Sequence, residues 1–134
     1  MSKSLIQTAY TDSQALTVGN TLPLGTVIRR FGCSLMQNGS SIMAHGDGYF
    51  TITGTVTLAP EAIGNVSVAA FENGVQIPGA VSTGSVSTAD NSVTLPIVTT
   101  IRKGCCCTDD SVITLRLLEG ASTISNVSLR VEKA

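Results

Sequence analysis

Aromatic and charged side chains are scarce in this sequence of 134 residues. It contains three Phe, two Tyr and no Trp, and only 13% of its residues are charged, about half the usual share. The basic residues are scattered singly or in isolated pairs, whereas affinity for nucleic acids depends mostly on clustered positive charge. We therefore expect no nucleic-acid partner and a core built from aliphatic side chains.

Long apolar runs are missing as well. No segment approaches the roughly 20 consecutive apolar residues that span a bilayer, and the N-terminus lacks the apolar stretch and cleavage site of a signal peptide. We expect no membrane partner and synthesis in the cytoplasm without a signal peptide. The net charge of −1 and the 43% of hydrophobic residues favour self-association, because weakly charged proteins tend to associate.

Motifs for catalysis and for calcium are also missing. The sequence has one histidine, His45, within Ala44–Gly48, and neither a Gly-x-Ser-x-Gly elbow nor an Asp-x-Asp-x-Asp-Gly loop. A catalytic triad needs a nucleophile and an orienting acid beside its histidine. We therefore interpret His45 as a turn residue and expect neither enzymatic activity nor catalytic residues.

The most regular pattern that is present lies in residues 48–58. One register holds Tyr49, Thr51, Thr53, Thr55 and Thr57, and the other holds Phe50, Ile52, Gly54, Val56 and Leu58. Successive side chains of a strand point to opposite faces, so this segment is predicted to be a half-buried antiparallel strand. A single row of threonines is the ordinary solvent face of a strand rather than a lattice for binding ice or sugars.

Short alternating segments recur about every ten residues along the chain, with turn residues between them. We predict strands at Ser4–Tyr10, Gln14–Val18, Thr26–Phe31, Ser41–His45, Tyr49–Ala59, Val66–Glu72, Val75–Ile77, Ser92–Ile101, Val112–Glu119 and Thr123–Val131. Pro96 inside an apparent strand predicts an edge position or a bulge, and Pro78 is placed at a strand end. Asn73-Gly74 predicts a hairpin turn, and Gly79–Asn91 is predicted to be a long loop.

These segments predict an all-β fold. We expect a two-sheet antiparallel sandwich of jelly-roll type with about 8–10 strands, and an immunoglobulin-like sandwich is the alternative. No linker or repeat divides the sequence, so residues 1–134 are expected to form one domain.

Three consecutive cysteines stand at positions 105–107, and two interpretations of them remain open. In the first, Cys105 and Cys107 bind zinc or iron, in a trimer with one cysteine per chain on the axis. Zinc sites normally space their cysteines two to four residues apart, so the one-residue gap departs from that pattern. Further candidate ligands are Cys33, His45, Asp109 and Asp110. In the second, the cysteines are small buried hydrophobes, and the protein has no cofactor.

Several motifs follow one another from Gly48 onward in a known order. They are Gly48-Tyr49-Phe50, Asn65–Val68, Glu72–Val75, Pro78, Thr94–Ile97, the cysteine run and Asn126–Lys133. In this order they resemble small jelly-roll proteins encoded in prophages of Firmicutes. Those proteins are similar to the trimeric heads of the complement-type globular domain and tumour necrosis factor superfamily. Residues 1–45 match less well, and we interpret them as a docking region.

This resemblance implies a homotrimer in which Tyr49, Phe50 and Ile52 contribute to core and subunit packing. It implies a non-enzymatic structural role on a bacteriophage particle, as a capsid decoration or a fibre head. The implied partner is the phage major capsid protein or another virion protein, and the implied location is the virion surface after synthesis in the bacterial cytoplasm. The alternative is a receptor- or carbohydrate-binding adhesin head that uses its loops, although few aromatic residues are available to hold a sugar.

Overall fold

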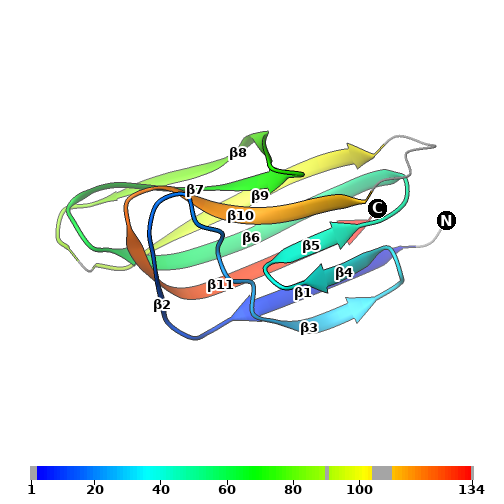
Figure 1. Ribbon diagram of the computed structural model, residues 1–134, viewed down its shortest axis with the longest axis horizontal. Helices are drawn as coiled ribbons and strands as arrows, with labels where there is room; N and C mark the ends of the chain where they lie inside the picture. Colours follow the sequence, from blue (N-terminus) through cyan, green and yellow to red (C-terminus); the bar gives the residue numbers. More distant parts are fainter. Residues whose placement is uncertain (1–2, 90, 104–109, 134) are drawn as a thin grey trace.

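The computed structural model describes residues 3–89, 91–103 and 110–133. These residues form eleven β-strands and no helix, with 73% of the chain in strands. The strands form two antiparallel sheets that face each other as a sandwich (Figure 1). The predicted two-sheet antiparallel sandwich is thereby confirmed, with one strand more than expected. Within the described part of the chain, no helix is long and apolar enough to cross a membrane.

The first sheet, sheet A, contains both ends of the described chain. Its strands lie in the order β3 (Thr26–Phe31), β1 (Ser4–Tyr10), β11 (Ser122–Lys133), β6 (Gly48–Pro60) and β9 (Val93–Lys103). The short strand β2 (Gln14–Leu16) also pairs with β11. Because β1 and β11 are antiparallel and Ser4 lies opposite Lys133, the first and last strands bring the chain ends to the same end of the sandwich.

The second sheet, sheet B, faces sheet A across the core. Its strands lie in the order β4 (Leu35–Asn38), β5 (Ser41–Ala44), β10 (Ser111–Glu119), β7 (Gly64–Glu72) and β8 (Val75–Val86). The segment after β2 crosses to this sheet, where the Leu22 amide donates to the Leu115 carbonyl at 2.8 Å. The Leu117 amide donates to the Asn20 carbonyl at 3.1 Å, so this segment extends sheet B beside β10.

The core between the sheets is almost entirely aliphatic, as the composition predicts. Phe50 is the only aromatic residue among the largest fully buried side chains. In β6, Phe50, Ile52, Val56 and Leu58 are all fully buried, which confirms the alternation seen in the sequence. Full burial of such a side chain contributes about 1.5–3 kcal/mol to folding.

The predicted long loop at Gly79–Asn91 is wrong over its first half. Strand β8 continues to Val86, which pairs with Gly64, and Val81 pairs with Ala69 of β7. This stretch is rich in small polar residues and in glycine, which lack the propensity that marks a strand. Pairing with the buried strand β7 nevertheless keeps it extended, and its inward-facing Gly84 approaches the Leu95 side chain of β9.

Strand β4 was also missing from the predicted set. It pairs with β5 through Asn38 opposite Ser41, and only Leu35 of its four residues is fully buried. The strand therefore contains too little apolar alternation to be seen in the sequence.

Turn and proline positions follow the sequence prediction with one exception. Asn73 (φ 54°) and Gly74 (φ 81°) form the predicted hairpin turn, since both residues tolerate positive φ. Pro96 lies in the edge strand β9, as expected. Pro78 lies inside β8 rather than at a strand end. It is accommodated because β8 is an edge strand whose register with β7 shifts between Ala69 and Phe71.

Candidate functional site

The outer face of sheet A is a broad surface of hydroxyl groups and exposed apolar side chains. It comprises Leu5, Gln7 and Ala9 of β1, Phe31 and Arg29 of β3, Tyr49, Thr51, Thr53, Thr55 and Thr57 of β6, Thr94, Pro96, Val98, Thr100 and Arg102 of β9, and Ser128, Arg130 and Glu132 of β11. Three large apolar side chains stand out on it: Val98 is 65% exposed, and Phe31 and Tyr49 are each 54% exposed.

The charged side chains on this outer face of sheet A are Arg29, Arg102, Arg130 and Glu132, of which Arg130 and Glu132 form an ion pair. Two rows run across strands β9, β6 and β11, namely Val98–Thr53–Arg130 and Thr100–Thr51–Glu132. Arg130 Nη2 lies 3.2 Å from Glu132 Oε1, so these two charges compensate each other. Thr57 and Thr94 share a hydrogen bond of 3.0 Å between their hydroxyls. A molecule that covers this face must therefore supply hydrogen-bond partners for its hydroxyl groups and charges.

The three residues predicted for core and subunit packing lie on different sides of β6. Phe50 and Ile52 are fully buried inside the sandwich, whereas Tyr49 is on the outer face of sheet A. Of the three, only Tyr49 is therefore placed to meet another molecule. Val98 and Phe31 join Tyr49 on this face but were not singled out from the sequence. The alternation within 93–103 is the signal that would have pointed to Val98.

A buried polar chain connects the two sheets at the end of the sandwich where the chain begins and ends. The Lys103 ammonium donates a hydrogen bond to Ser111 Oγ at 3.1 Å, and Ser111 Oγ donates to Glu72 Oε2 at 2.7 Å. Lys103 and Ser111 are 7% and 4% exposed. Buried charges are tolerated when they are paired and hydrogen-bonded. These hydrogen bonds between Lys103, Ser111 and Glu72 therefore fix β9, β10 and β7 relative to one another. The Ser111 hydroxyl is too enclosed to meet a substrate.

His45 and Asp110 form an exposed pair beside these buried hydrogen bonds. His45 Nδ1 lies 2.6 Å from Asp110 Oδ1, with side chains 69% and 35% exposed. The His45 amide donates to the Ser34 carbonyl at 2.8 Å, consistent with a residue that ends β5. Ser111, the neighbour of Asp110, directs its hydroxyl to Glu72 rather than to His45, so it does not complete a triad.

The candidate metal ligands are only partly placed. Cys105, Cys107 and Asp109 lie outside the described residues, and Cys33 is an exposed free thiol. His45 and Asp110 are brought together, although 65 positions separate them in the sequence. Within the described ranges, no group of three or more His, Cys, Asp or Glu side chains is arranged to hold a metal ion.

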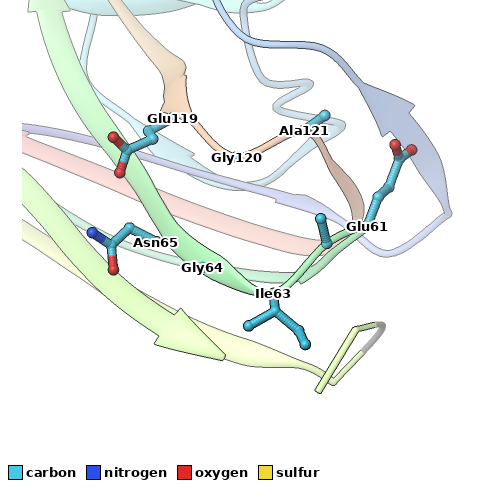
Figure 2. A pocket seen from close by; sticks show the side chains of 8 residues that line it. Glu61, Ile63, Gly64, Asn65, Glu119, Gly120 and Ala121 are labelled. Carbon is cyan, nitrogen blue, oxygen red and sulfur yellow. The ribbon is translucent and has the colours of Figure 1, made fainter. Parts of the chain in front are cut away.

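A shallow pocket of about 400 Å³ lies at the opposite end of the sandwich. It is lined by Glu61, Ala62, Ile63, Gly64, Asn65, Glu119, Gly120 and Ala121. Figure 2 shows Glu61 and Glu119 on opposite sides of the pocket, with the Ile63 side chain between them. Its Glu61 amide donates to the Ala121 carbonyl at 2.9 Å. None of the eight lining residues is a Ser, Thr, Cys or His, the side chains on which a Ser-His or Cys-His acyl-transfer site depends.

Comparison with solved structures identifies the architecture as a jelly roll of the tumour necrosis factor and complement type. Murine APRIL superposes with a TM-score of 0.74 at 11% identity, covering 99% of this chain and 100% of that chain. The globular domain of zebrafish complement 1qA gives 0.69 at 5% identity, covering 96% and 94%. The vertex protein P5 of PRD1 gives 0.69 at 13% identity, covering 97% and 96%.

The likeness is one of fold rather than of sequence. The chain matches no protein-family model, and no curated protein sequence matches it. The superpositions establish the shared jelly roll. At identities this low they do not indicate function, which has to be inferred from the surfaces of the chain itself.

Proposed function

We propose that the protein is a non-enzymatic structural protein of a bacteriophage particle, a homotrimeric jelly roll that forms a capsid decoration or a fibre head. The observation that carries this proposal is the outer face of sheet A. It combines exposed Tyr49, Phe31 and Val98 with rows of short hydroxyl side chains. Exposed apolar surface of this kind marks sites where proteins associate.

In a closed threefold ring each subunit presents one surface to the next subunit and a second surface to the previous one, so all three subunits are covered in the same way. Strands β8 and β9 form one pair of sheet edges, and β3 and β4 form the other (Figure 1). Long unpaired edges invite uncontrolled strand pairing, and packing within a ring covers them without leaving a growing end. Tyr49 and Val98 then supply apolar contact area, and Phe50 and Ile52 hold β6 rigid from inside.

The placement on a virus particle is supported by one of the similar structures, the vertex protein P5 of PRD1. We infer a position on the virion surface, with the major capsid protein or another virion protein as the partner. Residues 4–44, which supply strands β1 to β5, are proposed to contribute to docking. The Firmicutes prophage origin belongs to the same proposal.

Electron microscopy of particles tests this role directly. Particles assembled with the gene intact should show a surface feature with threefold symmetry that is missing from particles lacking the gene. Supplying the wild-type protein to the deficient particles should restore the feature. If the protein is absent from purified particles, the proposed role is wrong, whatever its oligomeric state.

A further inference from the structure

One cation on the outer face of sheet B lies on an aromatic ring. Arg116 of β10 places its guanidinium carbon 4.8 Å from the centre of the Phe71 ring of β7. The two residues are diagonal neighbours, since Arg116 pairs with Ala69 and Thr114 pairs with Phe71. Arg116 is the only Lys or Arg in the five strands of sheet B. Ala69, the residue opposite Arg116, is small and leaves room for the guanidinium beside the ring.

The hydrogen-bonding capacity of this guanidinium is unused. Arg116 Nε is buried without an acceptor, and no group in the described part of the chain accepts a hydrogen bond from the guanidinium. Its two Nη atoms reach the surface of this half-buried side chain. Glu119 lies on the same face, opposite Ser67 beyond the register shift, and forms no ion pair with Arg116.

An Arg that has an aromatic ring on one side and, among the described residues, no hydrogen-bond acceptor is suited to bind a carboxylate. The ring of Phe71 removes water from one side of the guanidinium and restricts its movement, so less side-chain entropy remains to be lost on binding. A carboxylate that approaches the two Nη atoms end-on would form two parallel charge-assisted hydrogen bonds. Charge-assisted hydrogen bonds are roughly twice as strong as those between neutral groups, so they favour a carboxylate over water at a partly buried site.

The surroundings favour a protein as the source of the carboxylate. Arg116 occupies one side of the Phe71 ring, so that side is not available as a platform for a sugar ring. The adjacent Val81 is 41% exposed and lies opposite Ala69, which gives the site an apolar border. Arg and aromatic residues beside exposed aliphatic surface are typical of the energetically dominant part of protein interfaces.

We propose that Arg116, held on Phe71, is a docking site for an Asp or Glu side chain of another protein. An acidic occupant is inferred from charge complementarity, because within the described ranges Arg116 is a cation without an ion-pair partner on a face that has no other basic residue. The site is on sheet B, and the proposed subunit contact is on sheet A, so the proposal stands or falls independently of the trimer.

Nuclear magnetic resonance of the Arg116 Nε–H group tests the site, with a capped tetra-aspartate peptide as the probe. We expect a saturable shift of this resonance with tetra-aspartate and none with a capped tetra-asparagine peptide. Arg116→Gln should weaken tetra-aspartate binding about tenfold, the effect of losing one charge-assisted hydrogen bond. Arg116→Lys should give an intermediate loss, because the ammonium keeps the charge and loses the fork.

Arg130→Gln is the matched control, since Arg130 is on the other sheet and is already paired with Glu132; its affinity for the peptide should equal that of the wild type. Well-dispersed amide spectra establish that each variant is folded. The proposal is overturned if Arg116 Nε–H does not respond up to millimolar peptide, or if Arg116→Gln binds as well as the wild type. A saturable response to glucuronate in place of the peptide would overturn the choice of a protein partner.

Discussion

Gly54 lies directly opposite Leu129 in the ladder between β6 and β11, and the two backbones meet without space for another side chain. A Cβ atom at Gly54 would stand 3.0 Å from the Ser128 carbonyl oxygen and 3.2 Å from Leu129 Cδ1. The glycine that interrupts the apolar register of β6 therefore allows close contact with β11 at the centre of sheet A.

Substitution of Gly54 by Ala should lower the free energy of unfolding by about 1–3 kcal/mol, the usual cost of overpacking. The carbonyl that the new methyl group meets belongs to a central ladder and cannot move freely. Gly84→Ala is the matched control, because the atoms it would meet are the ends of the Leu95 and Val93 side chains. Urea denaturation should show a smaller loss for Gly84→Ala, and equal losses would contradict this explanation.

Ser111→Ala should destabilise the fold by about 1–3 kcal/mol, because it removes the hydroxyl between the Lys103 ammonium and the Glu72 carboxylate. Ser125→Ala provides the comparison: Ser125 is exposed and donates only to the Thr57 carbonyl at 3.2 Å. Its substitution should change the free energy of unfolding by less than about 0.5 kcal/mol. Thermal denaturation of both variants measures the difference. An unchanged melting temperature for Ser111→Ala would show that the buried hydrogen bonds of Ser111 do not stabilise the fold.

Asn73→Ala should cost about 1–2 kcal/mol at the hairpin between β7 and β8. Asn73 has a φ of 54°, which alanine adopts at a penalty. Its Oδ1 also accepts a hydrogen bond of 2.9 Å from the Val112 amide. Asn73→Asp retains the acceptor and tolerates positive φ, so its unfolding free energy should stay close to that of the wild type. A loss for Asn73→Asp as large as for alanine would refute this assignment of roles.

Substitutions at two valines of similar exposure can distinguish a subunit contact from ordinary surface. Val98 is 65% exposed on the outer face of sheet A, and Val75 is 70% exposed at the hairpin before β8. Val98→Asp would place a charge inside the proposed interface, where desolvation is costly, so it should dissociate the trimer into folded monomers. Val75→Asp should leave the assembly intact. Size-exclusion chromatography distinguishes the outcomes, and equal behaviour of the two variants would place the contact elsewhere.

Most of the architecture follows from periodicity that is visible in the sequence. The bounds Ser4–Tyr10 and Thr26–Phe31 agree with the observed strands, and β6 has the predicted inward and outward faces. The errors lie where alternation is weak. Residues 79–86 are extended because β7 pairs with them. Their conformation therefore depends on the partner strand and cannot be predicted from the residues of the segment alone.

The polar contacts were less accessible from the sequence. His45 meets Asp110 because β5 and β10 are neighbours in sheet B, with Ala44 opposite Ser111. Lys103 of sheet A reaches Glu72 of sheet B through Ser111 because strands of the two sheets end at the same place. Arg116 and Phe71 are likewise brought together by the register of β10 and β7. Local spacing does not encode such contacts. The threonine face of β6, in contrast, was predicted in full, and the structure adds its neighbours on β9 and β11.

Multi-angle light scattering of the purified wild-type protein measures whether the protein is a homotrimer. We expect a mass near three times the 13.8 kDa of the chain, which persists on dilution to low micromolar concentration. A mass of one chain across that concentration range would contradict it.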